Sequence, residues 1–281
     1  MLIKKLSVKI LRGFLLVALF GFLGSSLELI ANSKVKTKIK TNSKSNIAKK
    51  QKEKSKPALS GRQIMEKNKS LPEAKDIKSQ ALMKIYKKGY LLEKEFETIS
   101  KKVPEGDLVL LSFLRPTNIK LLTHSYKKKK NDQWLRLSSG KVKRINSSDK
   151  GRSFVNSHFS YEELEPFYLE DYQYKFLGEE KIFDFFCYKV KAVKKKDRVY
   201  DSLIYYLRKA DFFIIRIDFY KQNKMVKYLL NQKIKKIDDI ITPFEVVMQL
   251  AGSKDKTILS FKSIQYNNNL KNFKFSKAAL R

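Results

Sequence analysis

The most informative stretch of the chain is Trp134–Leu164, WLRLSSGKVKRINSSDKGRSFVNSHFSYEEL. It begins with two short runs of alternating polar and apolar residues, Trp134–Leu137 and Val142–Ile145, joined by a Ser-Ser-Gly link. Alternation favours half-buried strands, and glycine supplies the backbone freedom that a tight turn needs. The first half of the stretch therefore predicts a β-hairpin.

The second half of the stretch gathers large apolar side chains on a polar loop. Four of them fall within eleven positions: Phe154, Phe159, Tyr161 and Leu164. Among them, Ser160 and Glu163 have the S-x-x-E spacing of a capping box, which predicts the start of a short helix. Two interpretations stay open: the segment is a lid over an apolar surface, or its aromatic side chains simply fill the core beneath a long loop.

The rest of the chain consists of short alternating runs separated by turns. Eleven such runs flank the hairpin: Ile77–Ile85, Tyr90–Ser100, Leu108–Leu114, Ile119–Tyr126, Tyr172–Phe176, Phe186–Ala192, Leu203–Arg208, Phe213–Tyr220, Met225–Asn231, Val246–Leu250 and Ile258–Tyr266. Strands joined by short turns pair antiparallel, and no helical segment is long enough to supply parallel crossovers. The sequence predicts a mainly β fold: one curved antiparallel sheet, or an incomplete β-barrel of about 10–11 strands, with a small helical lid.

Helical material is scarce, being limited to Gly61–Asn68, the turn after Ser160 and Ser276–Leu280. So little helix should cover the inner face only partly and leave an apolar cleft suited to acyl chains, at ~0.8 kcal/mol for each buried CH₂. The alternative is a sandwich-like core that is packed shut. Alternation places five side chains toward the cavity, although a shift of one residue would reverse the face. These are Met83, Ile85, Leu111, Phe113 and Trp134, with Phe154, Phe159, Tyr161 and Leu164 as lid contacts.

The N-terminal region has the parts of an export signal. Lys4, Lys5, Lys9 and Arg12 precede an apolar run, Phe14–Leu23, and small residues follow it. This order is typical of a secretory signal peptide, and the apolar run is short for a membrane span of ~20 residues. We therefore expect a signal peptide or N-terminal anchor over residues 1–31, a disordered lysine-rich linker over 32–60, and a folded domain over 61–281.

Charge and composition exclude several classes of function. A formal net charge of +33 would suit a protein that binds nucleic acid or an anionic membrane. Nucleic acid is excluded as a natural ligand if the protein is exported. An A/T-rich coding bias would also enrich lysine without any functional meaning. One cysteine, Cys187, excludes an intrachain disulfide. The two histidines, His124 and His158, have no partner at metal-ligand spacing, and no catalytic or phosphate-binding motif occurs. We expect neither an enzyme, a metal site nor a cofactor.

The chain resembles a known family in several places. Residues 153–164, SFVNSHFSYEEL, are similar to the S-F-x-G-S-D-F-S-Y-E-D-L segment of the outer-membrane lipoprotein-sorting protein family, the LolA-like periplasmic carriers. Asn156, His158 and Glu163 stand where that family has glycine and two aspartates. Further similar segments follow in the same order: residues 107–116 (DLVLLSFLRP), Leu177-Gly178-Glu179-Glu180 with Cys187, Thr242-Pro243, and Phe275 to Leu280. The resemblance extends from about residue 60 to the end of the chain.

The resemblance implies an antiparallel half-barrel with a helical lid and a cavity for lipid or lipoprotein acyl chains. It also implies a periplasmic location and transport toward the outer membrane, with a large inner-membrane exporter as partner for some members. The alternative is an interaction module that docks to such an exporter, or to an anionic membrane surface, through its lysines.

Overall fold

The structure, a computed structural model, describes residues 59–196 and 198–281. The predicted signal peptide and nearly all of the predicted linker lie outside the described residues. Within the part of the chain that is described, no helix is both long enough and apolar enough to cross a membrane.

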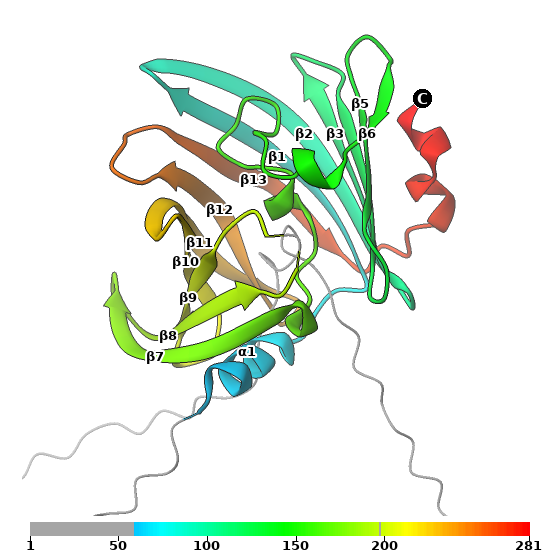
Figure 1. Ribbon diagram of the computed structural model, residues 1–281. Coiled ribbons are helices and arrows are strands. Elements are labelled where there is room, and N and C mark those ends of the chain that lie inside the picture. Colours follow the sequence, from blue (N-terminus) through cyan, green and yellow to red (C-terminus); the bar gives the residue numbers. More distant parts are fainter. Residues whose placement is uncertain (1–58, 197) are drawn as a thin grey trace, which may run out of the picture.

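Thirteen strands form a single antiparallel sheet in the order β6-β5-β4-β3-β2-β1-β13-β12-β11-β10-β9-β8-β7. The strands are β1 (Asp76–Lys87), β2 (Tyr90–Val103), β3 (Gly106–Arg115), β4 (Lys120–Tyr126), β5 (Asp132–Arg136), β6 (Val142–Arg144), β7 (Tyr172–Ile182), β8 (Phe185–Lys194), β9 (Ser202–Arg208), β10 (Ile214–Lys221), β11 (Lys224–Ile237), β12 (Ile240–Leu250) and β13 (Lys256–Tyr266). The sheet is strongly curved but not closed into a barrel, because β6 and β7 remain its edges (Figure 1). The predicted fold class is confirmed, with more strands than expected.

The predicted hairpin forms at one edge of this sheet. Trp134 pairs with Arg144 and Arg136 with Val142, so β5 and β6 are antiparallel as expected. The extra length lies mainly in β11 and β12, which continue to a turn at Asp238 and Asp239. Lysines dominate the added end of β11, where Lys233, Lys235 and Lys236 are exposed, whereas Ile240 and Ile241 at the start of β12 are buried.

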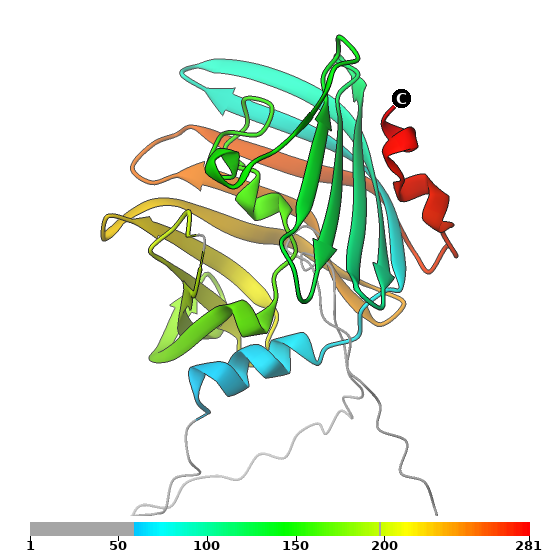
Figure 2. The same ribbon diagram turned by 45° about the vertical axis from the view of Figure 1, so that its right-hand side comes forward.

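Within residues 59–196 and 198–281, the helices are few and short, as predicted. They are α1 (Gly61–Lys69) and the 3₁₀ turns η1 (Ser147–Asp149), η2 (Glu162–Leu164), η3 (Leu169–Asp171), η4 (Asn272–Phe275) and η5 (Lys277–Leu280). A capping box starts α1: the Gln63 amide donates to Ser60 Oγ, and the Ser60 amide donates to Gln63 Oε1. The helix packs against β7 and β8 at one end of the concave face (Figure 2).

Gly61 allows α1 to approach the sheet closely. A Cβ atom at this position would lie 2.8 Å from backbone atoms of Lys175 and Phe176 on β7. Ile64 and Met65 of the helix are completely buried and belong to the main hydrophobic core. The N-terminal helix therefore helps to close one end of the hollow.

The C-terminal turns η4 and η5 cover the opposite face of the sheet from α1 and the 153–164 segment. They contact β3 and β4, and Leu270, Phe275 and Leu280 pack in a separate cluster with Leu122. Figure 2 shows this segment outside the curve of the sheet. Counting Ser276–Leu280 as cover for the inner face was wrong, because its apolar side chains find their partners on the convex side.

Candidate functional site

A flap formed by residues 153–168 lies on the concave face of the sheet (Figures 1 and 2). Its first half is closed into a loop by a bridge between Ser153 and Ser160, and the Phe154 amide donates to the Phe159 carbonyl at 2.8 Å. This tight loop turns the aromatic side chains toward the sheet. Phe154 is fully buried, and Phe159 is only 4% exposed.

Aromatic contacts join the flap to the floor beneath it. The rings of Phe154 and Phe113, on β3, have centroids 5.8 Å apart, and Phe113 in turn lies 5.7 Å from Phe96 of β2. At the far end of the flap, the Phe167 ring lies 5.7 Å from Tyr205 of β9. Such pairs add ~0.5–1.5 kcal/mol each beyond the area they bury. The aromatic side chains of the flap therefore pack against an apolar floor, and their role as a lid stays a prediction.

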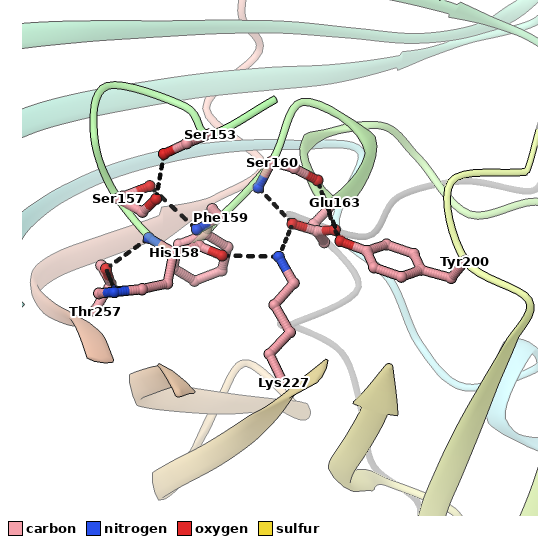
Figure 3. A network of polar contacts seen from close by, with 9 residues as sticks. All are labelled: Ser153, Ser157, His158, Phe159, Ser160, Glu163, Tyr200, Lys227 and Thr257. Carbon is pink, nitrogen blue, oxygen red and sulfur yellow. Dashed lines mark hydrogen bonds and ion pairs between the residues drawn. The ribbon is translucent and has the colours of Figure 1, made fainter. Parts of the chain in front are cut away.

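A buried ion pair fastens the middle of the flap to the sheet (Figure 3). Lys227 Nζ, from β11, lies 3.0 Å from Glu163 Oε2 and donates to the His158 carbonyl at 2.8 Å. The Tyr200 hydroxyl and the Ser160 amide also donate to the Glu163 carboxylate, each at 2.5 Å. The carboxylate is therefore well satisfied although it is almost inaccessible to water, which is the condition for a stable buried charge.

His158 forms a second attachment, to β13. Its amide donates to Thr257 Oγ1 at 3.0 Å, and its Nδ1 lies 2.9 Å from the same oxygen (Figure 3). Burial lowers the pKa of His158, and Lys87 and Lys227 act in the same direction. The imidazole is therefore neutral near pH 7 and serves as a hydrogen-bonding group of the flap.

Two further carboxylates of the flap are paired with lysines. Glu162 Oε1 lies 2.5 Å from Lys194 Nζ of β8, and Glu165 lies 2.8 Å from Lys150 Nζ. Burial raises the pKa of Glu162 despite this partner. The flap thus has two buried carboxylates, Glu163 and Glu165, and one partly buried carboxylate, Glu162, each paired with a lysine from a different part of the chain.

The capping box predicted at Ser160 is present only in part. Glu163 does reach back to the Ser160 amide, but the Ser160 hydroxyl donates to the Glu163 carboxylate at 2.7 Å and caps no backbone amide. The helix is a single 3₁₀ turn, Glu162–Leu164. The carboxylate serves mainly as the attachment point for Lys227, which the local spacing does not reveal.

Eight of the nine residues predicted to line the cavity or the lid lie in one hydrophobic core. They are Met83, Ile85, Leu111, Phe113, Phe154, Phe159, Tyr161 and Leu164. Trp134 is the exception, and its inward assignment was wrong: it packs on the opposite face with Leu122 and Phe275. Its neighbour Leu135 faces the concave core instead. The error is a shift of one residue in β5, where Trp134 and Leu135 are both apolar and alternation gives no preference.

The flap's own side chains occupy much of the space in which an open cleft was expected. Beside them, an interior pocket of about 50 Å³ lies between the flap and strands β8 to β10. Its lining includes Phe167, Tyr172, Leu203, Tyr205 and Phe219. Since one water takes up roughly 30 Å³ in the liquid, this volume is far too small for an acyl chain. An acyl chain can enter only if the flap moves.

Comparisons with known proteins agree with this architecture. A protein-family model that bears the description "Uncharacterized protein" matches residues 105–281, which is more than half of the chain. The chain belongs to the family that this model defines. No curated protein matches the sequence.

Solved structures extend the comparison to nearly the whole described chain. A DUF1329 family protein from Desulfovibrio piger is 27% identical, with a TM-score of 0.73, and the match covers 78% of this chain and 96% of that one. A domain from Vibrio parahaemolyticus, named for outer membrane lipoprotein sorting, is 25% identical, with a TM-score of 0.74, and covers 78% and 97%. A LolA superfamily protein from Nitrosomonas europaea shares the fold at 15% identity and a TM-score of 0.62, covering 79% and 100%. The resemblance to LolA-like lipoprotein-sorting proteins is confirmed.

Proposed function

We propose that this protein is a periplasmic carrier that shields the acyl chains of a lipoprotein or lipid beneath the flap on their way toward the outer membrane. The observation that carries the proposal is the contrast between the extensive apolar contacts of the flap and its few polar attachments. Its aromatic side chains rest on a continuous apolar floor, while its side-chain attachments to the strands include a small set of bonds to Lys227, Thr257, Lys194 and Asp107.

This contrast suits a lid that opens for an apolar guest. When the flap lifts, Phe154 and Phe159 leave the floor, and acyl methylenes can take their place on the same surface at ~0.8 kcal/mol for each CH₂. The lifted flap would pack Phe154 and Phe159 on the guest and keep them out of water, so the cost of opening would be largely that of the polar attachments. The relatives named for lipoprotein sorting support the same class of cargo.

The test is to purify the protein without detergent, extract it with organic solvent, analyse the extract by mass spectrometry, and measure the uptake of a fluorescent fatty acid. We expect bound lipid in the native protein and saturable uptake. Phe159→Asp should abolish uptake, because it places a charge on the apolar floor. Phe273→Asp is the matched control, since Phe273 is 72% exposed on the convex side.

Protein that is consistently empty and takes up no fatty acid would contradict the proposal. Salt-sensitive binding of that empty protein to anionic vesicles, without dependence on acyl chains, would favour the alternative of a docking module.

A further inference from the structure

A second hollow, strongly basic, opens beside the flap. It has a volume of about 660 Å³ and lies between the β4–β5 turn, the segment after β6 and the β8–β9 turn. Nine of its lining residues are lysine or arginine, and three are aspartate or glutamate. We call this hollow the basic mouth. The lysine runs 127–130 and 194–196, which are far apart in the sequence, meet across it.

Internal ion pairs do not balance this charge. Lys150 and Lys194 are paired with flap carboxylates and Arg144 with Asp132, but Lys127 and Lys195 donate to the backbone carbonyls of Pro104 and Glu170. Exposed Lys128 and Lys196 have no carboxylate partner among the residues that the structure describes. Like charges held close together repel one another, and an anion in the mouth would relieve that repulsion.

The basic mouth adjoins the interior pocket. Asn131, Glu165, Asp171 and Lys194 line both hollows. Going inward from the lysines, the lining changes from mainly cationic to aromatic and aliphatic side chains, among which the carboxylates of Glu162, Glu163 and Glu165 are already paired with lysines. A ligand that spans both hollows would have an anionic end and an apolar end.

An unpartnered hydroxyl lies at the inner side of this boundary. Tyr205 is 1% exposed and lines the interior pocket, and its hydroxyl has no hydrogen-bond partner within the described part of the chain. A buried hydroxyl without a partner costs ~1–3 kcal/mol. The carbonyl oxygen of an acyl ester, placed between head group and chain, would accept that bond.

We propose that the basic mouth binds a phosphate-bearing head group of net negative charge, on an amphiphile whose acyl chains lie under the flap. The inference rests on the proposed carrier function and adds the chemistry of the cargo's polar end. Lysine ammonium groups suit phosphate oxygens, with which they form charge-assisted hydrogen bonds.

The test compares four soluble probes by calorimetry on the full chain: dioctanoyl-phosphatidylglycerol, dioctanoyl-phosphatidylcholine, dioctanoylglycerol and glycerol phosphate. We expect the anionic lipid to bind about tenfold more tightly than the zwitterionic and uncharged ones. The double variant Lys128→Gln/Lys196→Gln should lose most of that advantage and leave dioctanoylglycerol binding unchanged. Lys254→Gln/Lys274→Gln removes the same charge from exposed sites outside the mouth and should change neither.

Each other outcome overturns a defined part of the account. Equal binding of the three lipids, or equal losses in both double variants, would overturn the head-group site and leave the carrier function standing. Glycerol phosphate binding as tightly as the anionic lipid would show a site for free phosphate esters and overturn the amphiphile. If no lipid binds, the carrier function fails and the inference fails with it.

Discussion

Lys227 and Glu163 form a buried ion pair that joins β11 to the flap, with Nζ and Oε2 3.0 Å apart and side chains only 9% and 1% exposed. Because both charges are out of water, removing one of them leaves the other without compensation. The cost of breaking a buried pair in this way is ~3–5 kcal/mol. The pair therefore holds the flap down most firmly when both members are present.

Lys227→Met should release the flap. We expect the free energy of flap opening to fall by ~3 kcal/mol, which corresponds to a loss of about 100-fold in hydrogen-exchange protection of the flap amides. Amides in the centre of β1 and β13 should keep their protection. Hydrogen exchange followed by mass spectrometry measures both regions in one experiment.

The double variant Lys227→Met/Glu163→Gln is the matched control, since it leaves no charge buried at this place. It should regain much of the protection that the single variant loses. Equal losses in the two variants would show that the ion pair is not what fixes the flap.

Asp107 makes stability depend on pH. It lies on β3 and accepts a hydrogen bond from the Tyr168 hydroxyl, at the end of the flap, at 3.1 Å. Burial raises the pKa of Asp107 to about 7. The folded state therefore holds a proton that the unfolded state has already released above pH ~4, so this group's contribution to stability is present below pH ~4 and is lost as the pH rises to 7.

Asp107→Asn should remove this dependence. Asparagine resembles the protonated acid, so we expect the variant to match the native protein near pH 4 and to be more stable by roughly 3–5 kcal/mol near pH 8. Denaturant unfolding of both proteins at a series of pH values measures the difference. Parallel stability curves would mean that Asp107 is ionised in the folded protein throughout this range.

Trp134, the single tryptophan, allows a test of whether acyl chains bind on the concave or the convex face of the sheet. It packs under the C-terminal segment, with Lys277 Nζ 4.6 Å from its ring centre. Fatty acids brominated on the chain quench tryptophan only on contact, so acyl chains under the flap should leave its fluorescence unchanged. Phe167→Trp in a Trp134→Phe background places the reporter inside and should be quenched. Strong quenching of the native protein would put the acyl chain on the convex face.

The sequence predicts the fold well because period-two alternation and turn residues are local signals. The hairpin, α1 and most of the core at the flap follow from them. These signals do not predict on which face of the sheet the Trp134 side chain lies, because Leu135 beside it is equally apolar. They do not predict the attachment of Lys227 to the flap either. Its partners Glu163 and His158 are more than sixty residues away in the sequence, and only the curvature of the sheet brings them together. The one local hint is acidic residues within the apolar run 159–168, where burial demands partners.

The most direct test of the central claim is to find where the acyl chain lies. A fatty acid with a diazirine near its terminal methyl group can be bound, photolysed and located by peptide mass spectrometry. We predict crosslinks to the flap around Phe154 and Phe159 and to the floor around Leu111 and Phe113. Crosslinks confined to exposed apolar residues such as Tyr90 and Phe186, with none beneath the flap, would contradict the account.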